Sequence, residues 1–147
     1  MKAKNKIITA ILLSAGATVG TALINKYIKM SAISRNLLAQ PEPRCCRWRL
    51  GNIYYTKTGI GKPLLLVHDL THASSSCEWD SLIPLLKEHY TVYTIDLLGC
   101  GRSEKPNLTY TNFLYVQLLN DFVKSEIGRR TNILATGASA PIVTMAC

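Results

Sequence analysis

Acidic residues are nearly absent from the amino-terminal third of this 147-residue sequence. Residues 1–50 contain one acid, Glu42, against nine Lys and Arg, whereas residues 51–147 contain eight residues of each sign. The formal charge of +8 therefore belongs to the amino-terminal third and not to the rest of the chain. Because a nucleic-acid-binding domain carries its positive charge on its own face, this distribution argues against nucleic acid as a partner.

Charge of either sign is missing from the stretch "IITAILLSAGATVGTALI", Ile7–Ile24, which lysines flank on both sides. Its eighteen residues, at about 1.5 Å each, are near the lower limit for crossing a bilayer. We expect a basic terminus over residues 1–6 and a single-pass transmembrane anchor over residues 7–24. Two alternatives stay open: a signal peptide cleaved near Ala15-Gly16-Ala17, and a buried soluble helix.

The sequence gives only a weak indication of the side of a membrane on which the rest of the chain lies. Lysines flank both ends of the apolar stretch in similar number, so the positive-inside rule does not favour one orientation. The five cysteines are odd in number and follow no repeating pattern, which does not suggest a disulfide framework. Free thiols favour a reducing compartment and hence the cytoplasmic side. Gly16 and Gly20 have the spacing that lets two membrane helices associate, although small residues are common in such spans.

A change in composition and in hydrophobic pattern divides the remainder of the chain into two parts. Residues 25–47 form a basic linker that contains "PEPR", Pro41–Arg44, where two prolines break regular structure. Residues 48–147 alternate between strand-like and helix-like stretches, which predicts an α/β domain with a mostly parallel sheet and flanking helices. The predicted strands are 48–59, 64–68, 91–96 and 131–136, and the predicted helices are 75–87 and 111–128. A capping-box pattern, Ser75 to Glu78, marks the start of the first helix, and Gly128 marks the end of the second.

The loop after Thr136 contains the best candidate for a nucleophile. A serine on a tight turn from strand to helix needs small residues two positions before and two after it. Gly137 meets the first requirement of Ser139, and Pro141 replaces the usual glycine at the second. The amide of Ala140 would then be one oxyanion donor, although an ordinary turn at the end of a strand is the plain alternative.

The loop after the strand 64–68 is the second candidate region, because parallel strands bring their carboxyl ends to one edge of a sheet. An amide in the region Asp69–Leu70 would supply the second oxyanion donor. We expect His68 to orient this loop by hydrogen bonding rather than to act as a base. His72 and His89 are expected in loops or on the surface.

Phosphate-binding patterns are incomplete in this sequence. Gly59-Ile60-Gly61-Lys62 is followed by proline, where a P-loop needs Ser or Thr. The pair Gly99 and Gly101 lacks the third glycine of a dinucleotide fingerprint. No His and Cys cluster suggests a metal, so we predict neither a cofactor nor a metal.

Taken in order, these features resemble the α/β-hydrolase superfamily, in its branch of esterase-, epoxide-hydrolase- and peptidase-like members. The resemblance rests on "GKPLLLVHDL", "SSSCEWDSLIPLL", "YTVYTIDLLGCGRSEKP" and "ATGASA", and it extends from about Tyr54 to the last residue. The second loop matches that branch's D-x-x-G-x-G-x-S pattern through Asp96, Gly99, Gly101 and Ser103. The resemblance implies a Ser–His–acid hydrolase with Ser139 as nucleophile and the amides of Leu70 and Ala140 as the oxyanion hole.

Three departures accompany the resemblance. Asp69 follows His68 where glycine is usual, and Pro141 alters the turn around the serine. No acid and no histidine follows Ser139, although the fold's chain order is nucleophile, acid, histidine. We therefore expect the amino-terminal portion of a membrane-anchored serine hydrolase that is inactive by itself, with an unknown small-molecule substrate. The alternative is a non-catalytic relative that binds a small molecule or a partner at the membrane.

Overall fold

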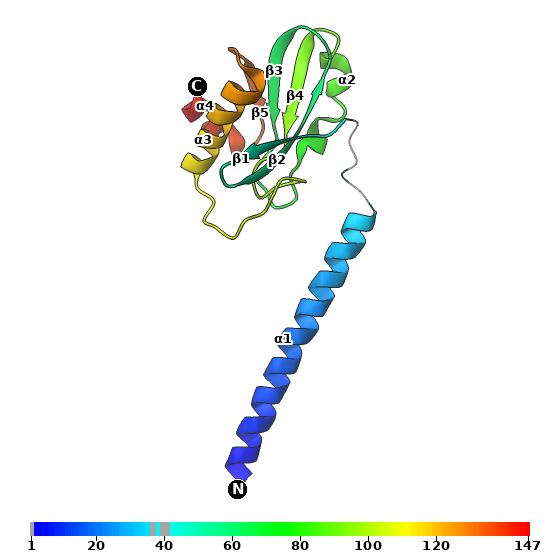
Figure 1. The fold of residues 1–147 in the computed structure, drawn as a ribbon, viewed down its shortest axis with the longest axis vertical. Helices are drawn as coiled ribbons and strands as arrows, with labels where there is room; N and C mark the ends of the chain where they lie inside the picture. Colours follow the sequence, from blue (N-terminus) through cyan, green and yellow to red (C-terminus); the bar gives the residue numbers. More distant parts are fainter. Residues whose placement is uncertain (1, 36–37, 39–41) are drawn as a thin grey trace. The chain divides into compact units, whose positions relative to one another are not determined.

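The computed structural model describes residues 2–35, 38 and 42–147, and it divides the chain into two compact units, Met1–Ala39 and Gln40–Cys147. The first unit contains one long helix, α1, Lys2–Ser34 (Figure 1). This helix includes the first ten residues of the predicted linker, because neither glycine nor proline interrupts the sequence between Gly20 and Pro41.

Among the described residues, no helix is both long enough and apolar enough to cross a membrane. The predicted anchor lies within α1, but its first nine residues, 7–15, are outside the part of the chain whose side chains are described. The described remainder of the predicted anchor exposes large apolar side chains, including Val19, Leu23 and Ile24. The transmembrane anchor therefore stays a prediction from the sequence.

The second unit is built on a five-stranded sheet in the order β1-β2-β4-β3-β5 (Figure 1). The strands are β1 Arg44–Trp48, β2 Gly51–Thr58, β3 Lys62–Val67, β4 Tyr90–Ile95 and β5 Asn132–Ala135. The β1–β2 and β2–β4 pairs are antiparallel, whereas β3 pairs in parallel with both β4 and β5.

The prediction of a mostly parallel sheet is therefore wrong, and the sheet is mixed. The predicted strand 48–59 starts at the last residue of β1, crosses a turn at Arg49 and Leu50, and otherwise corresponds to β2. The other residues of β1, 44–47, fall within the predicted linker 25–47. A connection as short as this turn joins antiparallel neighbours, whereas parallel neighbours need a longer crossover. Longer crossovers that contain helical turns join β3 to its parallel neighbour β4, and β4 to β5, which lies beyond β3 in the sheet.

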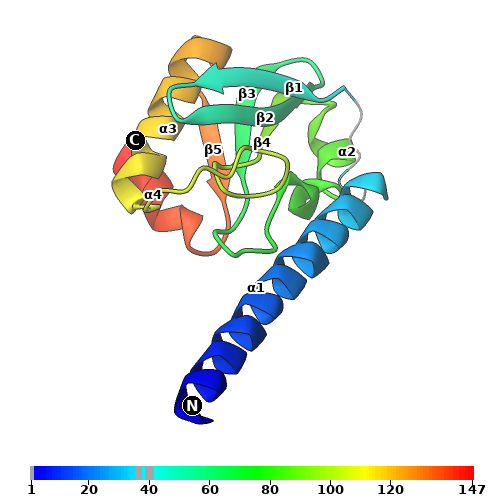
Figure 2. The ribbon, with the colours of Figure 1, turned by 60° about the horizontal axis from the view of Figure 1, so that its bottom comes forward.

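Helices cover both faces of the sheet. The helical segments are η1 Ser76–Trp79, α2 Ile83–Leu86, α3 Asn112–Phe122 with its continuation η2 Val123–Ile127, and α4 Ser139–Ala146. α3 and α4 lie on one side of the sheet and α2 on the other (Figure 1 and Figure 2). Because side chains alternate along a strand, Leu65 and Val67 pack in the cluster with α3 and α4, and Leu66 packs with Trp79.

The two predicted helices have different outcomes. The helix expected over 111–128 is confirmed: Thr111 caps its start by accepting the amide of Leu114, and Gly128 ends it with a left-handed φ of 70°. The continuous helix expected over 75–87 is wrong, since the segment consists of η1 and the single turn α2. The Ser75 side chain makes no cap bond, and Pro84 in the first turn of α2 cannot continue a helix from upstream.

Candidate functional site

The carboxyl ends of β3, β4 and β5 lie side by side at one edge of the sheet. Val67 is in register with Ile95 on one side and with Ala135 on the other. The loops after β3 and β4 carry His68, Asp69 and Asp96, and the turn after β5 leads to Ser139, the first residue of α4. The structure thus brings together residues that are far apart in the sequence, at the edge where parallel α/β sheets hold their chemistry.

Asp96 organises the loop after β4. Its buried carboxylate accepts the backbone N–H of Ser76 at 2.7 Å and the backbone N–H of Arg102 at 2.9 Å. Gly101 has a φ of 47°, and a Cβ atom there would lie 2.4 Å from the Asp96 carboxyl carbon. The carboxylate therefore needs glycine at 101, and it joins this loop to the start of η1.

Two further residues of the D-x-x-G-x-G-x-S pattern make close contacts in the same loop. The Ser103 hydroxyl donates to the Asp96 carbonyl at 2.5 Å and accepts the backbone N–H of Tyr54 at 2.9 Å. A Cβ atom on Gly99 would lie 2.8 Å from the ring of Tyr110. In the structure, Asp96 and Ser103 form hydrogen bonds with main-chain groups. The two glycines of the pattern leave space for neighbouring side chains.

His68 joins the loops after β3 and β4. Its ring is fully buried, and Nε2 accepts the backbone N–H of Leu97 at 3.0 Å. An amide only donates, so Nε2 carries no proton and Nδ1–H donates to the Asp69 carbonyl at 2.5 Å. Both ring nitrogens are thus used by main-chain groups, and the imidazole has no free nitrogen for a reacting group.

Ser139 is the first residue of α4 and is 1% exposed. Its hydroxyl donates to the His68 carbonyl at 2.5 Å. A nucleophile elbow instead exposes its serine on a strained turn. Among the described non-glycine residues only Glu42 has a positive φ, and the turn before α4 is made by Gly137, with a φ of 56°. In this arrangement Ser139 Oγ points to the main chain of the loop after β3.

Asp69 makes the contact that ties this loop to α4. Its Oδ1 accepts the backbone N–H of Leu70 and the backbone N–H of Ala138, both at 2.7 Å. A Cβ atom on Gly137 would lie 2.1 Å from the same oxygen, so the carboxylate rests directly on the turn. The amide of Ala140 donates to the Gly137 carbonyl at 3.2 Å. Both amides predicted as oxyanion donors are thus hydrogen-bonded within the protein.

Glu78 is a member of this site that the sequence reasoning did not identify. Its Oε2 accepts the backbone N–H of Asp69 at 3.1 Å and the hydroxyl of Thr136 at 3.3 Å. The sequence pattern at Glu78 was a capping box, which predicts that its carboxylate pairs with the nearby Ser75 and not with Asp69 or Thr136. For Asp69 the signal was its departure from the usual His-Gly pair.

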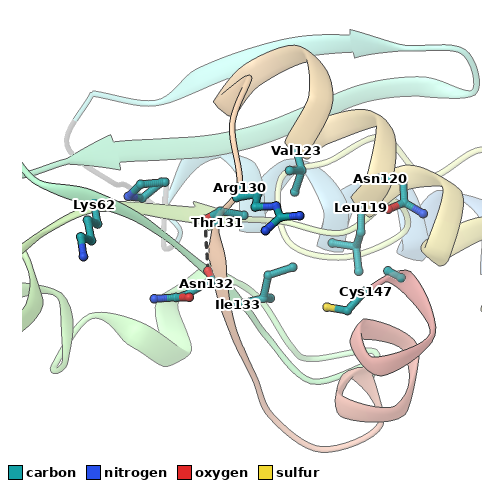
Figure 3. Close-up of a pocket in the computed structure, with 11 residues that line it drawn as sticks. Lys62, Leu119, Asn120, Val123, Arg130, Thr131, Asn132, Ile133 and Cys147 are labelled. Atoms are coloured by element: carbon teal, nitrogen blue, oxygen red, sulfur yellow. Dashed lines mark hydrogen bonds between the residues drawn. The ribbon is translucent and has the colours of Figure 1, made fainter.

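A surface pocket lies at the opposite end of the strands (Figure 3). Lys62 and Asn132, which begin β3 and β5, line it, and the Thr131 hydroxyl beside them donates to the Asn132 carbonyl at 3.1 Å. Leu119 and Ile133 form part of its apolar wall. Since Ser139 is at the carboxyl edge, none of the predicted site residues lines this pocket.

Curated proteins that are similar to this chain include two hydrolases. A 2-hydroxy-6-oxo-6-(2'-aminophenyl)hexa-2,4-dienoic acid hydrolase of Metapseudomonas resinovorans is 38% identical over 72 residues, which are 48% of this chain and 25% of that protein. A soluble epoxide hydrolase of Corynebacterium sp. (strain C12) is 44% identical over 54 residues, which are 37% of this chain and 18% of that protein. The matched part is thus a quarter or less of these relatives' length.

Solved structures share the fold. An α/β-hydrolase-fold protein from Burkholderia ambifaria has a TM-score of 0.65 at 26% identity, covering 70% of this chain and 37% of that one. A serine hydrolase involved in carbazole degradation has a TM-score of 0.61 at 29% identity, covering 65% and 38%. The model of the alpha/beta hydrolase family matches residues 64–145, more than half of the chain. With the sheet order and the carboxyl-edge loops described above, this match shows that the chain belongs to the alpha/beta hydrolase family.

Proposed function

We propose that residues 44–147 carry the nucleophile side of a serine hydrolase, with Ser139 attacking the carbonyl carbon of an ester or a related bond. The observation that carries the proposal is the position of Ser139 at the junction of β5 and α4, in contact with the main chain of the loop after β3. These two segments supply the nucleophile and the oxyanion donors in hydrolases of this fold. Two of the similar curated proteins are named as hydrolases.

Ser139 needs a base to become a useful nucleophile. The hydrogen-bond acceptor of its hydroxyl is the His68 carbonyl, which does not take up a proton, and both nitrogens of the His68 ring are used elsewhere. In this proposal the imidazole and its acid partner come from outside residues 44–147. The hydroxyl then turns from the carbonyl to that base before it attacks.

Fluorophosphonate labelling of the protein in its native cells, followed by peptide mass spectrometry, tests the assignment. We expect an adduct on Ser139, and we expect it to be absent from the Ser139→Ala variant. Ser103 is a matched internal control, because it is equally buried and also donates to a carbonyl at 2.5 Å. Labelling of other residues alone, or equal labelling of Ser103 and Ser139, would contradict a specific nucleophile.

A non-catalytic binding protein is the second candidate, and one observation favours it. The Asp69 carboxylate holds the Leu70 amide, and Ser139 is buried against a carbonyl, so the described arrangement leaves neither available to a substrate. This candidate expects a stable fold and ligand binding that the Ser139→Ala variant retains. Hydrolytic turnover that disappears in Ser139→Ala would rule it out.

Membrane anchoring is a further proposal, and it rests on the uncharged stretch Ile7–Ile24 and its flanking lysines. We expect the full chain to stay in the membrane pellet after alkaline carbonate extraction. A chain without residues 1–39 retains the second compact unit and should move to the supernatant. Recovery of the full chain in the supernatant would contradict the anchor. Self-association through Gly16 and Gly20 predicts that Gly16→Leu weakens cross-linking between chains in membranes.

A further inference from the structure

We propose that the Asp69 carboxylate is a built-in occupant of an anion site formed by the amides of Leu70 and Ala138, and that it closes this site to anionic groups. The inference rests on the proposed function in one respect, since it concerns the same edge of the sheet. It goes further by naming the residue that keeps the edge closed.

The geometry is that of a bound anion. Oδ1 accepts two backbone N–H groups at 2.7 Å, one from the loop after β3 and one from the turn before α4. Distances of this length are typical of charge-assisted hydrogen bonds. Gly137 has no side chain in the space that the carboxylate fills, and a Cβ atom there would lie 2.1 Å from Oδ1.

The two amides are donors of the kind that stabilise a negative oxygen. Backbone N–H groups that converge where a helix begins bind carboxylates and phosphates, and in acyl transfer they stabilise the developing oxyanion. Here the ligand belongs to the chain itself. A second negative oxygen at these amides would meet the Asp69 carboxylate as a like charge and be repelled.

The same contact extends to Ser139. Asp69 fixes the amide of Ala138, the residue before the serine, while the Ser139 hydroxyl donates to the carbonyl of His68, the residue before Asp69. These two hydrogen bonds cross-link the loop after β3 to the start of α4. Opening the site therefore requires loss of the Asp69 contact. Asp69→Gly removes this contact, and it also restores the His-Gly pair that the family resemblance implies.

Titration of the isotope-labelled full chain with inorganic phosphate, followed through the amide signals of Leu70 and Ala138, tests the proposal. In the wild-type protein we expect no saturable change at either amide. In Asp69→Gly we expect saturable changes at both, with affinity at least about tenfold higher than in the wild type. Equal phosphate binding by the wild type, or a folded Asp69→Gly that does not bind phosphate at these amides, would overturn the proposal.

Asp69→Asn covers the case in which Asp69→Gly does not fold. It keeps the size of the side chain and one oxygen acceptor but removes the charge, so the amide protons of Leu70 and Ala138 should move upfield together. Unmoved signals in a folded Asp69→Asn would show that the carboxylate does not hold the two amides, and the proposal would fail.

Glu78→Gln is the matched control, because it removes a neighbouring carboxylate that accepts the Asp69 amide but touches neither donor of the site. It should bind no phosphate at Leu70 or Ala138, and binding there would count against Asp69 as the specific occupant. Adding Ser139→Ala to Asp69→Gly should preserve phosphate binding. That result separates the two ideas, since the anion site can be correct even where Ser139 is not a nucleophile.

Discussion

Replacing Asp96 with alanine removes the acceptor that joins the loop after β4 to the start of η1. The hydrogen bond from the Ser76 amide is buried, and the one from the Arg102 amide is partly buried. A hydrogen bond to a charged group contributes about 1.5–3 kcal/mol. Allowing the upper value for Ser76 and about 1 kcal/mol for Arg102, which water reaches, we expect a loss of about 4 kcal/mol.

This loss is a large fraction of the free energy of unfolding of a typical domain, about 5–15 kcal/mol. For a domain of this size, about 1 kcal/mol shifts Tm by about 4 °C or more, so Tm should fall by at least about 15 °C. Denaturant unfolding monitored by tryptophan fluorescence measures the change, because both tryptophans, Trp48 and Trp79, lie in the second unit.

Two further variants make the test specific. In Asp96→Asn the side-chain NH₂ group faces one of the two backbone N–H donors, so this variant should lose nearly as much stability as Asp96→Ala. Asp80→Ala removes an exposed carboxylate and should change the free energy of unfolding by less than about 0.5 kcal/mol. If Asp96→Ala and Asp96→Asn are both as mild as Asp80→Ala, the loop is not held by its carboxylate and the reasoning is wrong.

Two other predictions follow from local environments. Burial raises the pKa of the Cys46 thiol to about 11, so iodoacetamide near neutral pH should alkylate the exposed Cys45 much faster than Cys46; equal rates in the folded protein, measured by mass spectrometry, would contradict this. Gly137→Ala should destabilise the domain well beyond Gly128→Ala, since both glycines have a positive φ but only the first would place its Cβ against Asp69. Denaturant unfolding compares the two variants, and equal losses would leave only the backbone conformation as the cause.

Short sequence patterns correctly predicted the elements in which the interacting residues are close together in the sequence. The cap at Thr111 and the left-handed Gly128 involve residues within one helix, and both ends of that helix match the prediction. The alternation of strands and crossovers likewise placed the three loops at one edge of the sheet. These features follow from chain spacing, because a helix end and a parallel crossover are decided within a few tens of residues.

The errors occur where a distant partner replaces a local one. Glu78 fits a capping box with Ser75, but its carboxylate instead accepts the amide of Asp69 and the hydroxyl of Thr136. Local spacing cannot show this outcome, because Thr136 is 58 residues away in the sequence. The mixed sheet has a similar origin, since the pairing of β2 with β4 rather than β3 depends on the packing of the whole sheet.

The carboxylate of Asp69 fills the space that the missing side chain of Gly137 leaves free. This contact changes the interpretation of the serine motif. On sequence alone, Gly137 satisfies the requirement for a small residue two positions before a nucleophile. In the structure the same glycine makes room for a carboxylate that arrives from the loop after β3. A glycine at this position therefore does not by itself indicate an active serine. The residue at position 69 also has to be considered, because its carboxylate accepts the amides of Leu70 and Ala138 and so occupies two donors near Ser139.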